Sequence, residues 1–242
     1  MARVLVTGST TGIGHATAAS LLRDGHEVVV HARSDARRAG ADDLLAAGAE
    51  IVVGDLAELT QVLALADAVD DLGPVDAVIH NAGVIDGPVL AVNVVAPYVL
   101  TARVPAPRHV VLSSSMHRGG RPDLPTDWSG ARPTRSYSDS KLLVTTLVAG
   151  VARRRPDLLV HAVDPGWVAT RMGGPSASGD LALSHFTQAW LATTDDAEAL
   201  TSGGYWFHQR TRRTHPAVND EALQDALLAS LAEHTGVDLP GR

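Results

Sequence analysis

Short apolar runs alternate with longer stretches of helical periodicity through the first two-thirds of the chain. The runs are apolar at successive positions rather than at every second one, as in strands that helices cover on both faces of a parallel sheet. Strands are therefore expected at six places: Val4–Thr7, Glu27–His31, Glu50–Val53, Asp76–His80, His109–Ser113 and Leu158–Val163.

Helical segments lie between these runs, at Gly14–Arg23, Ala36–Ala47, Leu59–Asp71, Leu90–Thr101 and Tyr137–Arg154. Such alternation requires right-handed crossovers, which predicts an α/β doubly wound parallel sheet, Rossmann-like, in three α/β/α layers. A less regular stretch at 171–192 precedes a last strand near Tyr205–His208 and a helix over Glu221–His234. No repeat or linker-like change of composition divides the 242 residues, so we expect a single domain over residues 1–242.

Composition and charge narrow the possible partners. The chain is 45% hydrophobic and 19% charged, which is typical of a compact protein. It has no cysteine and a net charge of −7, and no apolar run is long enough to cross a bilayer. We expect a cytoplasmic protein that acts on a small molecule, without nucleic-acid or membrane partners.

A glycine-rich turn follows the first predicted strand. Thr7 is followed by Gly8, Ser9, Thr10, Thr11, Gly12, Ile13 and Gly14, and then by a helix. Glycine allows a tight turn and a close approach of the backbone to a pyrophosphate, and the helix N-terminus presents free N–H groups to phosphates. A glycine cluster alone is often only a turn, but between a strand and a helix it indicates a dinucleotide site.

The end of the second strand bears on the choice of dinucleotide. Arg33 and Ser34 lie there, nineteen residues beyond Gly14, where an NAD site normally has a carboxylate. A guanidinium and a hydroxyl suit a 2′-phosphate instead, which favours NADP(H) over NAD(H). Arg37 and Arg38 follow, and a solvated helix face is the simpler interpretation for them.

Two further loops belong to the same edge of the sheet. Asp55 and Leu56 follow the third strand, and Asn81, Ala82 and Gly83 follow the fourth. Ligands of open α/β sheets bind at the carboxyl ends of the strands, so both loops are expected to line the cleft. Each is also ordinary turn chemistry, and that alternative stays open.

Tyr137 and Lys141 lie four residues apart in a strongly helical segment, which places them on one helix face. A nearby ammonium favours the phenolate and so lowers the pKa of a tyrosine that serves as a general acid or base. Lys141 is the only lysine of the chain, whereas arginine supplies the other basic residues. A lone lysine falls at this spacing from one of three tyrosines by chance only about 1% of the time.

Three serines, Ser113, Ser114 and Ser115, follow the fifth predicted strand. A hydroxyl at this edge can hydrogen-bond a substrate oxygen as charge develops on it, although three serines also suit a plain loop. No Gly-x-Ser-x-Gly elbow is present, which disfavours a nucleophilic serine. No metal site is expected, because none of the eleven histidines has a metal-ligand spacing.

Some conspicuous side chains suit packing better than recognition. His117 and His185 are near enough to the predicted cleft to approach a substrate, but a buried polar role is favoured for both. Tyr205 is interpreted as a core residue.

Together these motifs resemble the short-chain dehydrogenase/reductase family, in its retinol dehydrogenase-like and bacterial carbonyl reductase branch. The resemblance runs over about residues 3–172 and adds Asn93, Pro165, Gly166, Val168 and Thr170 to the residues above. It implies NADP(H)-dependent hydride transfer between nicotinamide and a carbonyl or alcohol. Tyr137 would then exchange the proton, Lys141 would hold the ribose, Ser114 would align the carbonyl, and Asn93 would hold a relay water. Residues 166–170 would grip the carboxamide.

The chain departs from the family pattern in places. His80 stands where the family usually has an asparagine, and only twelve residues separate Asn81 from Asn93. The helix that holds Asn93, which is the fifth helix in the family's own count, is expected to be short, because Pro105 and Pro107 lie at its other end. This leaves the family's usual homo-oligomer undecided. Residues 171–190 would form a substrate lid with an apolar wall for a small lipophilic substrate. The alternative is a catalytically silent NADP(H)-binding redox sensor.

Overall fold

The computed structural model describes residues 1–129 and 135–239, so part of the segment between the serines and Tyr137 lies outside the described residues. One sheet runs through the molecule in the order β3-β2-β1-β4-β5-β6-β7-β8, and only β8 is antiparallel to its neighbour. The strands are β1 (Arg3–Val6), β2 (Glu27–Ala32), β3 (Glu50–Val53), β4 (Ala77–His80), β5 (Arg108–Leu112), β6 (Leu159–Val163), β7 (Tyr205–Phe207) and β8 (Arg210–Thr211). The doubly wound parallel sheet predicted from the sequence is confirmed.

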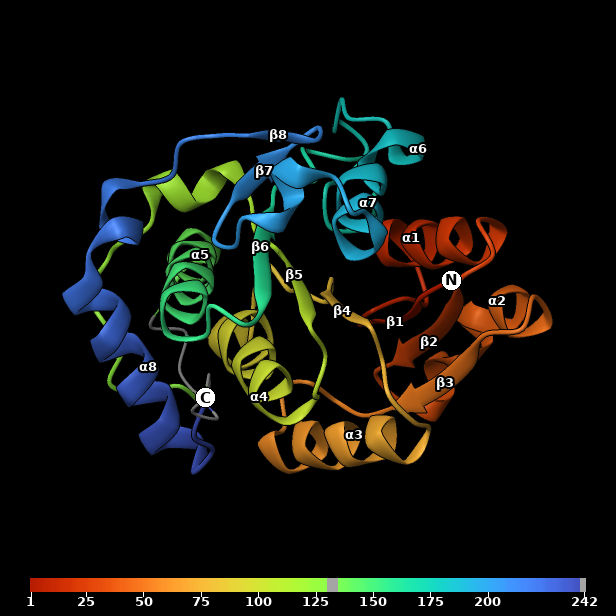
Figure 1. Ribbon diagram of the computed structural model, residues 1–242, viewed down its shortest axis with the longest axis horizontal. Helices are drawn as coiled ribbons and strands as arrows, with labels where there is room; N and C mark the ends of the chain where they lie inside the picture. The colour runs from red at the N-terminus through yellow and green to blue at the C-terminus, as the bar shows by residue number, and fades with distance from the viewer. Residues whose placement is uncertain (130–134, 240–242) are drawn as a thin grey trace.

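Helices cover both faces of this sheet (Figure 1). They are α1 (Gly12–Arg23), α2 (Asp42–Ala46), α3 (Leu59–Asp71), α4 (Ala96–Arg103), α5 (Tyr137–Arg154), α6 (Leu181–Ser184), α7 (Phe186–Thr193) and α8 (Glu221–Thr235). Short helical turns add η1 (Asp35–Ala41), η2 (Ala91–Val95), η3 (Ser115–Gly119), η4 (Ala197–Leu200) and η5 (Pro216–Asn219). Among the described residues, no helix combines the length and the apolar character needed to cross a bilayer.

Two hydrophobic cores lie on the two faces of the sheet. On one face α1, α2 and α7 pack against alternate side chains of the strands, as Leu21, Leu44 and Leu191 do. On the other face α3, α4, α5 and α8 form the larger core, with Leu65, Leu143 and α8 residues such as Leu227 buried in it. Strands covered on both sides are apolar at successive positions, which explains the sequence pattern.

Two expectations about helices were wrong. Residues 36–47 do not form one α-helix, because Gly40 packs so tightly on the glycine turn that a Cβ there would lie 2.6 Å from the Thr10 carbonyl oxygen. The chain therefore runs as η1 and then as α2. The stretch 171–192, expected to be less regular, contains α7, because Ala189, Leu191 and Ala192 are buried against the sheet.

Candidate active site

The sheet reverses its strand order between β1 and β4. Open α/β sheets bind ligands in a crevice at such a switch point, at the carboxyl ends of the strands. The glycine turn after β1 lies at this switch point. Gly8 and Gly12 have φ values of +65° and +63°, which side chains other than glycine rarely adopt. The turn leads directly into the N-terminus of α1, where backbone N–H groups are available to an anion.

The loop after β4 is joined to this turn by close contacts. The Asn81 side-chain amide donates hydrogen bonds to the Thr7 and Gly8 carbonyl oxygens at 2.8 and 3.2 Å. A Cβ at Gly8 would lie 2.9 Å from the Ala82 Cα, and one at Gly14 would lie 2.3 Å from the Asn81 Nδ2. Asn81 and Ala82 therefore lie against the glycine turn, and the role of the Asn81–Gly83 loop in cofactor binding stays a prediction.

A histidine that sequence reasoning passed over fixes the turn from the other side. His31 accepts a hydrogen bond from the Gly8 N–H through Nδ1 at 2.9 Å, and its Nε2 donates to the Gly54 carbonyl oxygen at 2.8 Å. Ser9 donates from Oγ to the Val6 carbonyl oxygen and accepts from the His31 N–H, both at 2.8 Å. Burial lowers the pKa of His31, so the neutral ring holds these bonds. Its position at the end of a strand was the only sequence signal.

At the ends of β2 and β3, Arg33 and Asp55 form an ion pair of 3.0 Å between Nε and Oδ2. The Arg33 side chain is 74% exposed and that of Asp55 is 24% exposed, so the pair lies at the surface of the crevice. Ser34 is exposed beside it, whereas Leu56 is buried in the core. The two predicted loops are thus brought together, with a guanidinium at their rim.

The loop after β6 forms the opposite lip. Gly166 has a φ of +84°, and the Thr170 N–H donates to the Val168 carbonyl oxygen at 2.8 Å. A Cβ at Gly12 would lie 3.5 Å from the Thr170 Cγ2, so this loop reaches across to the glycine turn. Pro165 starts the loop, and Ile13 on the facing side packs against the core.

A capping box sets the start of α5. The Ser136 hydroxyl accepts from the Asp139 N–H at 3.1 Å, and the Asp139 carboxylate accepts from the Ser136 N–H at 3.0 Å. Burial opposes ionisation of Asp139, but hydrogen bonds from Arg121 and Ser136 outweigh it and lower its pKa to about 2. These contacts fix Tyr137 at the first position of the helix.

Tyr137, Ser114 and Lys141 come together beside the crevice. The Ser114 hydroxyl lies near enough to the Tyr137 phenol to lower its pKa as a hydrogen-bonding neighbour, and the Lys141 Nζ lies 5.5 Å from the centre of the Tyr137 ring. Ser113 instead pairs with Thr145 at 2.6 Å inside the protein, and Ser115 is exposed. Of the three serines, Ser114 is the one that the structure places on the tyrosine.

The pKa of Tyr137 differs from the expectation. Burial raises the pKa of Tyr137 to about 12, the Ser114 hydrogen bond acts in the opposite direction, and the Asp164 charge raises it further. Burial also lowers the pKa of Lys141 to about 8, against the effect of Asp164. The expected lowering of the Tyr137 pKa by the ammonium does not occur here, because desolvation of the phenolate is the larger effect.

Asn93 lies in the π-helical turn η2, which runs directly into α4, and Pro97 occupies the second position of α4. The Asn93 side chain accepts a hydrogen bond from the Val84 N–H and donates to the Val84 carbonyl oxygen and to the Ser140 Oγ, each at 2.9 Å. The shortening predicted for this helix therefore falls in the loop before η2. At its other end α4 stops at Arg103, ahead of Pro105.

Gly83 lies close to both Asn93 and Lys141. A Cβ at Gly83 would lie 3.3 Å from the Asn93 Oδ1 and 3.6 Å from the Lys141 Nζ, so glycine allows this loop to approach the two side chains. The Lys141 Nζ donates one hydrogen bond, to the Leu112 carbonyl oxygen at 2.7 Å, and an ammonium has three donors.

Comparisons with known proteins agree with this geometry. A family model described as short chain dehydrogenase matches residues 2–102. An uncharacterized oxidoreductase of Emericella nidulans is 35% identical over 258 residues that cover all of both chains. The chain belongs to the short-chain dehydrogenase/reductase family.

Other members of this oxidoreductase family support the assignment. Mouse retinol dehydrogenase 14 is 30% identical and the match covers 91% of this chain and 81% of the mouse protein, in keeping with the retinol dehydrogenase-like resemblance. A blue fluorescent protein from a metagenomic library, solved in complex with NADPH, has a TM-score of 0.70 at 25% identity. That match covers 84% of this chain and 94% of the other.

One residue of this dehydrogenase/reductase went unnoticed in the sequence. Asp164 directly precedes Pro165 and Gly166, and it is only 6% exposed. Its charge acts on both Tyr137 and Lys141. A carboxylate at the carboxyl end of a strand, beside the family's Pro-Gly turn, was the signal that would have found it.

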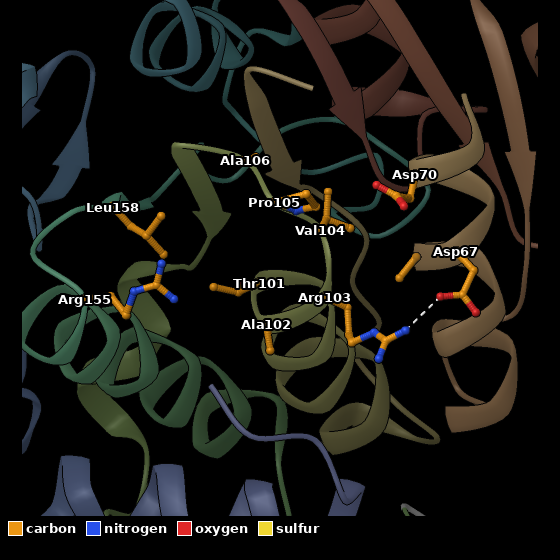
Figure 2. Close-up of a pocket in the computed structure, with 11 residues that line it drawn as sticks. Asp67, Asp70, Thr101, Ala102, Arg103, Val104, Pro105, Ala106, Arg155 and Leu158 are labelled. Carbon is orange, nitrogen blue, oxygen red and sulfur yellow. Dashed lines mark hydrogen bonds and ion pairs between the residues drawn. The ribbon is translucent and has the colours of Figure 1, made fainter. Parts of the chain in front are cut away.

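A hollow lies away from this site, between α3, α4 and the approach to β5 (Figure 2). Thr101, Pro105 and Leu158 line it, and Arg103 pairs with Asp67 at 2.9 Å along its wall. It lies at the amino ends of the strands, so none of the predicted site residues contributes to it. In the described part of the chain, no group of three His, Asp or Glu side chains could hold a metal ion.

Proposed function

We propose that this protein is an NADP(H)-dependent reductase that converts a carbonyl compound to an alcohol. The observation that carries the proposal is the grouping of Ser114, Tyr137 and Lys141: the Ser114 hydroxyl acts on the Tyr137 phenol, and the Lys141 Nζ lies 5.5 Å from the Tyr137 ring, one helical turn further along α5 and next to Gly83. These groups meet at the same edge as the glycine turn, where α/β sheets of this topology bind nucleotides.

The nicotinamide would supply the hydride for the carbonyl carbon. Tyr137 would donate its phenolic proton to the carbonyl oxygen, and the Ser114 hydroxyl would donate a hydrogen bond to the same oxygen as negative charge develops. The raised pKa of Tyr137 keeps the phenol protonated at neutral pH, which suits a proton donor in the direction of reduction. Lys141 would use its two remaining N–H donors for the ribose hydroxyls.

The cofactor proposal rests on Arg33. Its guanidinium lies at the carboxyl end of β2, is largely exposed, and is oriented by Asp55. Arginine binds phosphate oxygens through paired N–H donors, so Arg33 and Ser34 would hold the 2′-phosphate that distinguishes NADP(H) from NAD(H). The NADPH-bound relative in the same fold supports this choice.

The rim of the cleft favours a small lipophilic substrate. Large apolar side chains stay exposed on the loops that follow β4, β5 and β6, namely Ile85, Met116, Trp167 and Met172, which are 42–58% exposed. Leu183 and Phe186 add to them at 56% and 48%. Residues 171–185, ahead of the core contacts of α7, would form the movable part of the lid.

The test is NADPH oxidation measured against a panel of ketones and aldehydes. Turnover with at least one member, and a loss of about 100-fold or more in kcat/KM in Tyr137→Phe, would support the proposal. Tight NADPH binding without turnover, and without any effect of Tyr137→Phe, would favour a redox-sensing binding protein instead.

A further inference from the structure

The carboxylate of Asp164 is fixed at the end of β6 by two donors. The Tyr205 hydroxyl donates to Oδ2 at 3.1 Å, and the Gly166 N–H donates to Oδ1 at 2.9 Å. The carboxylate thus holds the turn in which Gly166 adopts its positive φ. Asp164 therefore links β7 to the loop proposed to bind nicotinamide.

Tyr205 carries this link toward the serine loop. The residue is 3% exposed, and its ring lies against the imidazole of His117 with 4.7 Å between ring centres. The Arg118 guanidinium carbon lies 5.8 Å from the centre of the Tyr205 ring. Tyr205 thus contacts η3 through its ring and Asp164 through its hydroxyl.

The hydrogen bonds of His117 determine which ring nitrogen carries the proton. Nε2 lies 3.1 Å from the backbone N–H of His215, which can only donate, so Nε2 is the acceptor. Nδ1 lies 2.7 Å from the Ser114 carbonyl oxygen, which can only accept, so Nδ1 is the donor. Burial lowers the pKa of His117, which agrees with a neutral ring. His117 therefore holds the backbone of the serine that contacts Tyr137.

Gly166 and Ser114, in the loops that follow the neighbouring strands β6 and β5, are thus connected through Asp164, Tyr205 and His117. We propose that these three residues, the Asp164 brace, are positioning residues that set the Ser114 loop against the Gly166 loop for the reaction. The inference rests on the proposed reductase function. None of the three is required to touch substrate.

The brace also acts through charge. The Asp164 charge acts on Tyr137 and Lys141 on α5, on Tyr205 on β7 and on His117 on η3, and the Arg118 charge acts on His117 and Tyr205 as well. Its carboxylate opposes the effect of burial on Lys141 and so raises the pKa of that ammonium. Loss of the Asp164 charge should therefore lower the pKa of Lys141, so that the ammonium releases its proton at lower pH.

The first experiment removes one hydroxyl. Tyr205→Phe is expected to lower kcat about tenfold, while the Kd of NADPH changes by less than about threefold. Tyr98→Phe is the matched control, because Tyr98 is also buried and donates one hydrogen bond, to the Val237 carbonyl oxygen at 2.7 Å, far from the cleft. If the two variants have the same kcat, the brace does not position the site.

The second experiment needs neither cofactor nor substrate. The single lysine gives one side-chain signal in protein labelled at the lysine Cε, and its chemical shift titrates with the Lys141 ammonium. Asp164→Asn is expected to lower that midpoint, about 8 in the unaltered protein, by about one pH unit. Asp225→Asn, on the exposed face of α8, should leave it unchanged. An unchanged midpoint in Asp164→Asn would overturn the inference.

The two experiments separate the brace from the proposed function. A shifted Lys141 midpoint in a protein that reduces no carbonyl would support the electrostatic part of the brace and refute the reductase proposal. If the protein reduces a carbonyl compound and the kcat of Tyr205→Phe equals that of Tyr98→Phe, the reductase proposal is supported and the positioning role of the brace is refuted.

Discussion

The imidazole rings of His80 and His109 share a hydrogen bond of 3.1 Å between Nε2 and Nδ1, on adjacent parallel strands and out of contact with solvent. Burial, and for His80 also the neighbouring ring, lowers the pKa of both, that of His109 to about 4. The histidine that replaces the family's usual asparagine thus points into the core, where its ring contacts β5 rather than the cofactor cleft.

This pair predicts a loss of stability in mild acid. The unfolded chain binds protons at its ordinary histidine pKa of about 6.5, whereas the folded His109 resists protonation down to about pH 4. Its contribution is therefore complete above pH 6.5 and falls between pH 6.5 and 4, with about 2 kcal/mol lost at pH 5.

Denaturant unfolding at pH 7.5 and 5.0 measures this. The double variant His80→Leu/His109→Leu should show a difference in unfolding free energy between the two pH values that is smaller by at least about 2 kcal/mol, because His80 adds its own share to that of His109. His31, His117 and His161 keep their own share of the pH dependence, because burial lowers their pKa values too. An undiminished difference in the double variant would contradict the prediction.

Arg33→Ala should change cofactor preference rather than catalysis. Without the guanidinium, we expect NADPH to bind about 10- to 100-fold more weakly and NADH to change by less than about threefold. Fluorescence titration with both nucleotides gives the two Kd values. Arg38→Ala is the control, since Arg38 pairs with Asp35 at 3.7 Å on η1. A retained preference for NADPH in Arg33→Ala would refute the phosphate assignment.

Ser114→Ala should lower kcat by about 100-fold, because it removes a hydrogen-bond donor aimed at the developing oxyanion. The melting temperature should change little, since the hydroxyl is only partly buried. Ser115→Ala removes an exposed hydroxyl one residue further and should leave kcat within about twofold. Equal effects of the two substitutions would show that the proximity of Ser114 to Tyr137 does not determine the rate.

Gly83→Ala adds a methyl group beside Asn93 and Lys141. The new methyl group would lie 3.3 Å from the Asn93 Oδ1 and 3.6 Å from the Lys141 Nζ, which is tight but tolerable for folding. We expect the Kd of NADPH to rise at least about tenfold, because the methyl group occupies space assigned to the cofactor. Gly119→Ala has no neighbour within 4 Å of its new Cβ and serves as the control. Unchanged binding in Gly83→Ala would place the cofactor elsewhere.

The sequence predicted best what depends on local pattern. The helix Tyr137–Arg154 has the predicted bounds, and every predicted strand is present, because buried parallel strands and long helices have strong periodic signals. The glycine turn and the Tyr137 and Lys141 pair could be identified because their spacing is constrained by the chemistry, whereas Ser114 was singled out from three serines only by the family resemblance. Their roles in binding and catalysis stay predictions.

What the sequence did not predict depends on contacts between distant segments. The change from η1 to α2 after Ala41 accompanies the packing of Gly40 on Thr10, and the raised pKa of Tyr137 comes from burial that no local pattern encodes. Asp164 and Tyr205 are 41 residues apart, so their hydrogen bond is visible only once β6 and β7 are paired.

The burial of Lys141 also decides how this protein responds to acylating reagents. Its only side-chain amine is 4% exposed. Succinimidyl esters should therefore leave Lys141 unmodified while the surrounding structure is intact. An acyl group on Lys141 would appear only when that structure opens, so its rate of incorporation, followed by peptide mass spectrometry, would report the opening directly.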